Sequence, residues 1–416
     1  MINDDFTLFS SENLKLNFNG TIYNIDDLKQ DFNLNKNLSA GNVLLQVFES
    51  NLINGKLNKE SITNIINILD GDFAFSISDG TNTVLARDPI GIKPLYYSNT
   101  NTSIFSSKLN INKNNIQNLK PGHILYNNND YFIYDLFKDT KPLNNNYDDL
   151  INKIIKTLYD SVYERVKNLN NIGLLCSGGV DSAFLAYILK NISKKTKLNI
   201  KLYAVGNKNS KDLIYSKKIA QQLNLPLKIQ TVTKDKIKEI LPKIINATKT
   251  TNNMKLGVAS TIYLATNLMK QDKQKIGLTG QGADELFAGY NRYIKHIENN
   301  TPEKLENELI HDLKNMYHVN LERDYAASAE NQIKLRLPYL SNKMIKLGLK
   351  IPIKYKITNK EDKLKKHILR DAATKYGIPE EISKRPKKAA QYGSGIDKII
   401  KKKLRKELNF EEILKK

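Results

Sequence analysis

The first 140 residues alternate apolar with small or polar residues over short runs, which is the pattern of β-strands. Residues 70–91, DGDFAFSISDGTNTVLARDPIG, alternate around Asp79-Gly80 and predict a β-hairpin. Asn19-Gly20 stands between two strand-like stretches and predicts a second turn. We therefore expect a β-rich first domain, followed by a polar linker over 138–148.

The pattern changes after the linker, where helical and strand-like segments alternate. Residues 148–169 place apolar side chains at helical spacing. Beyond them, strands at 172–176, 200–206 and 227–232 alternate with helices at 181–190 and 212–224. This order predicts a parallel α/β sheet.

Two later segments, 259–271 and 362–377, are mostly helical in pattern. In the second, Gly377 and Pro379 predict where the helix ends.

Composition fits this two-part organisation. The chain has 416 residues, enough for two domains with separate cores, and 40% of them are hydrophobic. No apolar run approaches the roughly 20 residues that a membrane helix needs, and the acidic start is unlike a secretory signal. A single cysteine excludes an internal disulfide framework and cysteine-based zinc sites, so we expect a cytoplasmic protein.

The net charge of +22 leaves two interpretations. A basic protein can bind nucleic acid, or it can have a generally basic surface. We favour the second because the lysines are spread along the chain, with dense runs only at 383–393 and 397–408. We expect the run at 397–408 to be a solvated helix face.

The segment SGGVDS, residues 177–182, lies between a predicted strand and a predicted helix. Glycines at such a junction let backbone N–H groups approach a phosphate, and the helix N-terminus adds unpaired donors. Asp181 would repel phosphates unless a cation lies between them, which favours Mg²⁺.

Other phosphate-binding loops fit this chain less well. Gly173 to Gly178 have the Walker A glycine spacing, but Gly179 stands where that motif needs lysine. Residues 280–285, GQGADE, lack the last glycine of a dinucleotide fingerprint. A strand followed by SGGxDS instead resembles the loop of the ATP pyrophosphatases, which split ATP into AMP and pyrophosphate.

Further segments, in the same order, resemble the asparagine synthetases. Those in the second part of the chain are GLTGQGADELFAGYNRY (277–293), IKLRLPYLSNKM (333–344) and KLKKHILRDAA (363–373). Those in the first part resemble the class II glutaminase domain of that family: FNGTIYN (18–24), LDGDFAFSISD (69–79) and LARDPIGIKPLYYS (85–98). The resemblance covers nearly the whole chain.

The resemblance implies both a fold and a reaction. Residues 1–140 would form an α+β domain, a truncated Ntn-hydrolase-like antiparallel sandwich with degenerate glutaminase character. Residues 147–416 would form an α/β domain, a parallel sheet with helices of the adenine nucleotide α-hydrolase type. The implied reaction uses ATP and Mg²⁺ to convert aspartate through β-aspartyl-AMP to asparagine.

Roles for single residues are also implied by the resemblance. Asp181 and Asp284 would bind Mg²⁺, while Lys366, Gln281 and Asp181 would serve catalysis. Lys366 would neutralise charge that builds on the phosphates. The nucleotide would lie against Cys176, Ser177, Gly178, Gly179, Ser182, Val205, Thr279 and Gly280.

The sequence departs from the family at three positions. Family glutaminases use a cysteine after the initiator methionine as nucleophile, but position 2 is Ile2 and the only cysteine is Cys176. We therefore expect no glutamine hydrolysis by this chain, unless an in-frame Met-Cys lies upstream of Met1. Gln281 replaces a glutamate thought to take the proton from ammonium, and Lys334 replaces another glutamate.

Several readings stay open at this point. Besides an ammonia-dependent asparagine synthetase, the chain could be a related amide ligase acting on another carboxylate, a tRNA-modifying ATP pyrophosphatase, or an inactive binding subunit. Expected partners are aspartate and ammonia, a separate glutaminase subunit or a homodimer, with neither nucleic acid nor membrane. Glu285 and Asp324 are candidates for the general base that Gln281 cannot be.

Overall fold

The computed structural model describes residues 6–98, 105–108, 116–138, 140–298, 301–386 and 390–415, so Ile2 lies outside the described residues. The chain forms two compact units. Unit 1 comprises Met1–Lys138 together with Lys314–Glu322, and unit 2 comprises Asp139–Leu313 together with Arg323–Lys416. The sequence pattern gave no sign that residues 314–322 belong with the first unit. Among the described residues, no helix has the length and apolar character to cross a membrane.

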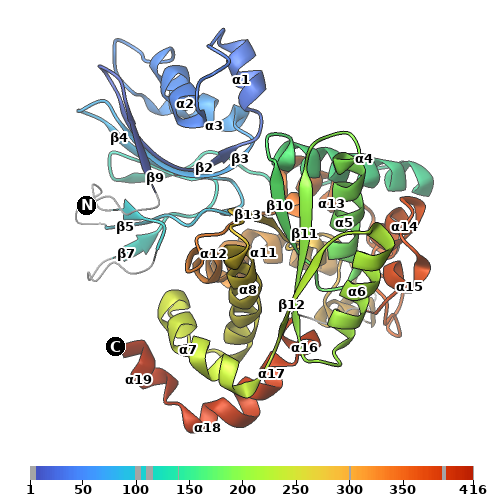
Figure 1. Cartoon of the computed structure of the whole chain (residues 1–416). Helices are drawn as coiled ribbons and strands as arrows, with labels where there is room; N and C mark the ends of the chain where they lie inside the picture. The colour runs from blue at the N-terminus through green and yellow to red at the C-terminus, as the bar shows by residue number, and fades with distance from the viewer. Residues whose placement is uncertain are drawn as a thin grey trace. The chain divides into compact units, whose positions relative to one another are not determined.

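Unit 1 is built on antiparallel sheets. A six-stranded sheet has the order β1-β2-β3-β4-β8-β9, and a three-stranded sheet has the order β6-β5-β7 (Figure 1). The strands are β1 (Thr7–Ser10), β2 (Lys15–Ile22), β3 (Gly71–Ser78), β4 (Thr83–Arg87), β5 (Tyr96–Ser98), β6 (Phe105–Ser106), β7 (Ile116–Asn118), β8 (His123–Tyr126) and β9 (Asn129–Phe132).

Three helices, which the strand pattern did not predict, complete unit 1: α1 (Ile25–Asp31), α2 (Ala40–Glu49) and α3 (Lys59–Ile68). Their apolar faces share one buried core with β2, β3 and β4. This combination of helices and antiparallel sheet agrees with the α+β class.

The two predicted turns of unit 1 have different outcomes. The hairpin is confirmed: β3 and β4 pair antiparallel, and Asp79 accepts the N–H groups of Thr81 and Asn82 in the turn. The turn at Asn19-Gly20 is wrong, because both residues lie inside β2. A Cβ on Gly20 would come within 2.4 Å of the Asp72 carbonyl oxygen, so this glycine serves close strand packing.

Unit 2 is a parallel five-stranded sheet with the order β12-β11-β10-β13-β14, which confirms the predicted α/β class. Its strands are β10 (Asn171–Leu175), β11 (Asn199–Gly206), β12 (Leu227–Thr231), β13 (Ile276–Leu278) and β14 (Lys334–Arg336). Figure 1 shows α5 (Val180–Ser193) and α6 (Lys211–Leu223) on one side of β10 to β12 and α8 (Asn253–Gln271) on the other.

The remaining α-helices of the chain lie mostly in unit 2. They are α4 (Tyr147–Val166), α7 (Lys234–Thr248), α9 (Ala283–Leu286), α10 (Ile294–Glu298), α11 (Pro302–Met316), α12 (Glu322–Ala329), α13 (Asn342–Lys350), α14 (His367–Lys375), α15 (Glu380–Ser383), α16 (Ala390–Gly393), α17 (Ile396–Ile399), α18 (Arg405–Glu407) and α19 (Phe410–Lys415). Short turns of other helix types occur at Asn291–Tyr293, Tyr317–Leu321, Pro338–Leu340, Ile353–Tyr355 and Ile400–Leu404.

Two helical predictions in unit 2 need correction. The segment 362–377 is helical only from His367, because Lys365 and Lys366 adopt left-handed backbone conformations with φ of 53° and 57°. The run at 397–408 is not simply solvated, since Ile400 and Leu404 are 0% exposed and belong to the core around α7 and α8. The local lysine pattern could not show what these two side chains pack against.

Candidate functional site

The order of the strands in unit 2 creates a switch point beside β10. The chain runs from β10 to β11 and β12 on one side and then returns to β13 on the other. In open α/β sheets, ligands bind outside the carboxyl ends of the strands at such a point. The loops after β10 and β13 meet there, because a Cβ on Gly280 would lie 2.9 Å from the Asp181 Cβ.

The loop after β10, residues 176–179, is shaped by its glycines. Gly178 has φ of +69°, and a Cβ there would lie 2.7 Å from the Tyr215 Cβ and 2.8 Å from the Asp212 carbonyl oxygen. Gly179 is the residue before α5, and a Cβ on it would meet only the Ser177 Oγ, at 3.6 Å. The first glycine therefore lets the loop lie against α6, and the second leaves the start of α5 open to a ligand.

Two hydroxyls close this loop. The Ser177 N–H donates to the Ser182 Oγ at 3.2 Å, and the Ser182 Oγ donates to the Gly179 carbonyl oxygen at 3.1 Å. The two hydroxyl oxygens lie 3.3 Å apart. Backbone amides and hydroxyls thus converge at the N-terminus of α5, as a phosphate site requires.

Lys366 connects the starts of the two helices that follow these loops, α5 and α9. Its Nζ lies 2.8 and 2.7 Å from the two carboxylate oxygens of Asp181 and 2.7 Å from Oδ1 of Asp284. The lysine side chain is 1% exposed, while the carboxylates are 19% and 15% exposed. Burial lowers the pKa of Lys366, and the charge of Asp181 opposes that shift.

Gly289 is a residue of this site that the sequence analysis missed. A Cβ at this position would lie 1.9 Å from Oδ1 of Asp284 and 2.3 Å from Cε of Lys366. Ala288 before it is 0% exposed and has φ of 56°, a rare conformation for a residue with a side chain. The glycine in the segment FAGY (287–290) was the available signal, because glycine often stands where the backbone must approach another group closely.

The carboxylates suit a magnesium ion. Asp181 and Asp284 come from the first turns of α5 and α9, and both contact one cationic atom, the Lys366 Nζ. Within the described ranges, no group of three or more His, Cys, Asp or Glu residues is placed to hold a metal. Mg²⁺ is usually bound by one or two carboxylates together with substrate phosphates and water, and Asp181 and Asp284 match the protein part of that donor set.

The other predicted nucleotide positions lie at the same edge of the sheet. Cys176 is 3% exposed directly after β10, and burial raises the pKa of its thiol. Val205 is the penultimate residue of β11, and Thr279 follows β13 with its N–H donating to the Arg336 carbonyl oxygen. Gln281 follows two residues later and is half-buried.

The two candidate general bases are both buried. Glu285 is 2% exposed and accepts a 2.6 Å hydrogen bond from the Tyr290 hydroxyl. Asp324 is 6% exposed and pairs with Arg323 at 2.7 Å. Burial raises the pKa of both carboxyl groups, so each binds a proton more readily than an exposed carboxylate does.

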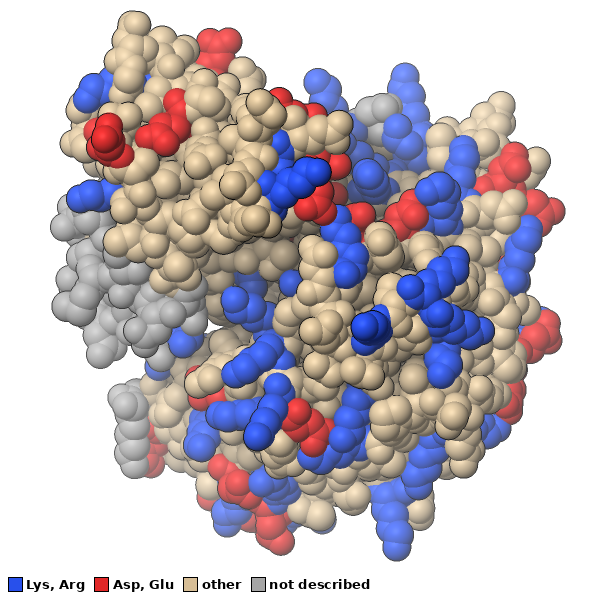
Figure 2. Space-filling model, turned by 45° about the horizontal axis from the view of Figure 1, so that its top comes forward, with Lys and Arg blue, Asp and Glu red and all other residues tan. Residues whose placement is uncertain are grey.

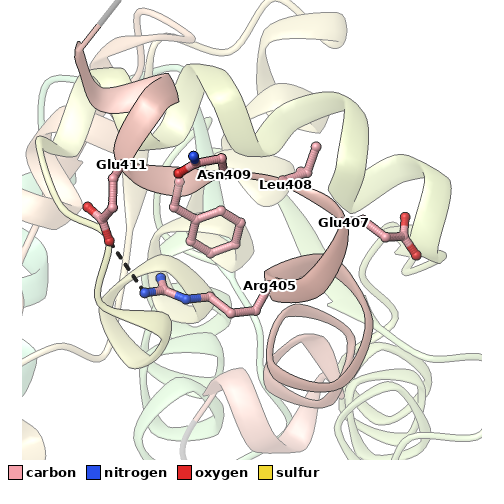
Figure 3. A pocket seen from close by; sticks show the side chains of 6 residues that line it. Arg405, Glu407, Leu408, Asn409 and Glu411 are labelled. Atoms are coloured by element: carbon pink, nitrogen blue, oxygen red, sulfur yellow. Dashed lines mark hydrogen bonds and ion pairs between the residues drawn. The ribbon is translucent and has the colours of Figure 1, made fainter.

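A pocket elsewhere on the chain holds none of the predicted residues. It lies around α18 and α19 and is lined by Arg405, Glu407, Leu408, Asn409, Phe410 and Glu411 (Figure 3). Arg405 turns toward Glu411, with 3.4 Å between their charged atoms.

The basic side chains are dispersed on the face of the molecule that Figure 2 shows, with acidic side chains among them. This agrees with the generally basic surface that we favoured for the net charge of +22.

Comparisons with known proteins show what this chain is similar to. Residues 153–304 and 295–412 match the family model described as asparagine synthase, and residues 5–113 match the glutamine amidotransferase domain. A putative glutamine-hydrolysing asparagine synthetase of Methanocaldococcus jannaschii is 32% identical, covering 95% of this chain and 80% of that protein. The Homo sapiens asparagine synthetase is 25% identical, covering 93% and 73%.

Among solved structures, similarity is weak. The NH3-dependent NAD synthetase from Campylobacter jejuni is 21% identical with a TM-score of 0.28, covering 42% of this chain and 95% of that one.

Proposed function

The chain belongs to the asparagine synthase family, and from this premise we propose that it makes asparagine from aspartate, ATP and ammonia. Family membership indicates the general reaction class, which is ATP-dependent amidation by a ligase of the asparagine synthetase type. The residues of the site support the finer steps below.

In the first step, an oxygen of the aspartate side-chain carboxylate attacks the α-phosphorus of ATP. The bond from this phosphorus to the oxygen that bridges it to the β-phosphorus breaks, so β-aspartyl-AMP forms and pyrophosphate leaves. We assign the pyrophosphate to the loop after β10, through Ser177, Gly178, Gly179 and Ser182. Lys366 stabilises the negative charge that grows on the departing phosphates.

The adenosine lies against the strand ends in this proposal. Cys176, Val205, Thr279 and Gly280 follow or end three adjacent strands at the switch point. Asp181 and Asp284 would hold a magnesium ion, which when bound neutralises charge on the phosphates.

In the second step, the nitrogen of ammonia attacks the acyl carbon of the adenylate. The bond from this carbon to the phosphate oxygen breaks, AMP leaves, and the nitrogen loses a proton to give the amide. An amide side chain cannot take this proton, so Gln281 orients ammonia by hydrogen bonding. Glu285 and Asp324 are the buried carboxylates proposed as acceptors.

We propose ammonia as the nitrogen source because the sequence contains one cysteine, Cys176. That thiol is buried at the end of β10, and its raised pKa disfavours the thiolate that attacks an amide.

One observation carries the proposal: the Lys366 ammonium lies within 2.8 Å of the carboxylates of Asp181 at the start of α5 and Asp284 at the start of α9. Asp181→Asn tests it, because this change should reduce pyrophosphate release at least about 100-fold while the circular dichroism spectrum stays the same. Asp160→Asn on α4 is the matched control, since Asp160 contacts only the exposed Lys156 among the contacts described. Full activity of Asp181→Asn would refute the assignment.

Substrate exchange tests the finer claims. Ammonium should support turnover, and glutamine should not. Turnover with another carboxylate in place of aspartate would indicate a different amide ligase, and a requirement for tRNA would indicate a tRNA-modifying enzyme. Nucleotide binding without any turnover would indicate a binding subunit.

A further inference from the structure

A buried arginine lies near the group formed by Lys366, Asp181 and Asp284, and it has no role in the mechanism above. Arg370 belongs to the first turn of α14 and is 1% exposed. Its Nε donates to the Lys365 carbonyl oxygen at 2.6 Å, and its Nη2 donates to the Leu364 carbonyl oxygen at 2.8 Å. Its Nη1 donates to the carbonyl oxygens of Ser383 and, at 2.9 Å, Arg385. One guanidinium therefore joins two chain segments that flank α14.

The first of these segments presents Lys366 in an unfavourable backbone conformation. Lys365 and Lys366 are consecutive left-handed residues with side chains, a backbone conformation that is unfavourable for such residues. Such a conformation persists only where the surroundings determine it. Here Asp362 accepts the N–H groups of Leu364 and Lys365 at 3.0 and 2.8 Å, and Arg370 holds their carbonyl oxygens.

The second segment reaches the phosphate loop. Arg385 is 7% exposed, and its Nη1 donates to the Ser177 carbonyl oxygen at 3.2 Å. Its Nη2 pairs with Asp212, the residue whose carbonyl oxygen lies beside Gly178. Because a trans peptide is planar, holding the Ser177 carbonyl also fixes the peptide that follows it.

We propose that Arg370 is a positioning residue for the amidation reaction. It holds the main chain next to Lys366 at a fixed position relative to the main chain at Arg385, whose side chain contacts the loop after β10. The three nitrogens of the guanidinium are all used, in a fixed planar fork. A lysine has one flexible ammonium group and cannot reproduce this set of contacts, so charge alone does not suffice. The kinetic part of this inference rests on the proposed function, and the structural part does not.

The test compares Arg370→Lys and Arg370→Met with the wild type and with Arg405→Lys, a control in the C-terminal pocket that touches none of these residues. Both Arg370 variants should lower kcat for pyrophosphate release at least about 10-fold, and KM for ATP should change less. Amide hydrogen exchange at 364–367, measured without substrates, should become faster in both variants.

Other outcomes distinguish a positioning role of Arg370 from a merely structural one. A merely structural role predicts a lower melting temperature, with unchanged kcat per folded molecule and unchanged exchange at 364–367, and that result would overturn the proposal. So would restoration of full kcat by Arg370→Lys. If both Arg370 variants fail to fold, Arg385→Lys replaces them in the test, because it leaves the hydrogen bonds from Arg370 to residues 364 and 365 in place. It should raise KM for ATP more than it lowers kcat, and unaltered kinetics would contradict the link. Faster exchange in a chain that forms no asparagine would support positioning while refuting the proposed function.

Discussion

Replacing Lys366 by methionine removes a cation that contacts both proposed metal ligands. Methionine keeps much of the buried side-chain volume, so packing changes little. The carboxylates of Asp181 and Asp284 are 19% and 15% exposed, and the change leaves both charges without this partner. Removing one member of a buried ion pair costs about 3–5 kcal/mol, because an uncompensated charge stays behind. We expect a loss of stability at the lower end of this range, since both carboxylates retain some contact with water.

Activity should fall further than stability. A preorganised charge aimed at a developing negative charge is worth about 100- to 1,000-fold in kcat. Urea unfolding and the rate of pyrophosphate release measure the two effects on the same preparation. Lys363→Met is the control, because Lys363 is exposed and only three residues away.

A double variant tests whether the loss of stability comes from the carboxylate charges that Lys366→Met leaves behind. Adding Asp284→Asn to Lys366→Met neutralises one of the two carboxylates that lost the Lys366 ammonium, so it should recover part of the lost stability and none of the activity. A free energy of unfolding of Lys366→Met within about 0.5 kcal/mol of the wild-type value, the range of ordinary surface changes, would refute this role of Lys366. The same conclusion follows if Asp284→Asn lowers the free energy of unfolding as much in the Lys366→Met variant as it does in the wild type.

Two further predictions concern residues to which the sequence alone assigned no role. Gly289→Ala should lower kcat by about 100-fold, because its Cβ would lie 1.9 Å from Oδ1 of Asp284 and displace it. Gly377→Ala, at φ +104° in open space, is the control; it should cost stability without changing kcat, and equal kinetics of the two variants would contradict the assignment. Lys356 is 1% exposed, and burial lowers its pKa from 10.5 to about 7, with Glu306 opposing the shift. Because the unfolded chain binds the extra proton between about pH 7 and 10.5, wild-type stability should rise with pH across that window. Lys356→Met should therefore stabilise by about 5 kcal/mol at pH 6 and about 2 kcal/mol at pH 9, at 1.36 kcal/mol per pKa unit, and an equal gain at both pH values in urea unfolding would refute the titration.

The sequence predicted those parts of the fold that depend on local pattern. The alternation of strands and helices after residue 147 is enough to predict a parallel sheet, and SGGVDS predicts a loop at a strand end. The position of Lys366 close to Asp181 and Asp284 followed from a family resemblance, and the structure brings the three together. Their catalytic roles stay predictions.

The missed features depend on contacts between distant segments. Asn19-Gly20 has turn-like chemistry, but β3 packs so closely on Gly20 that the strand continues through it. Lys366 has helical neighbours in sequence, yet Asp362 and Arg370 hold its segment out of the helix. A pattern of residue types contains no information on such partners until the chain is folded.

The transfer of oxygen from aspartate to AMP tests the central claim most directly. The assay incubates the protein with ATP, Mg²⁺, ammonium and aspartate labelled with ¹⁸O in its side-chain carboxylate, and the AMP and asparagine are analysed by mass spectrometry. If the carboxylate is adenylated, each AMP carries one ¹⁸O in its phosphate, and asparagine forms in equal amount. AMP without ¹⁸O, or ADP and phosphate as the products, would contradict the account.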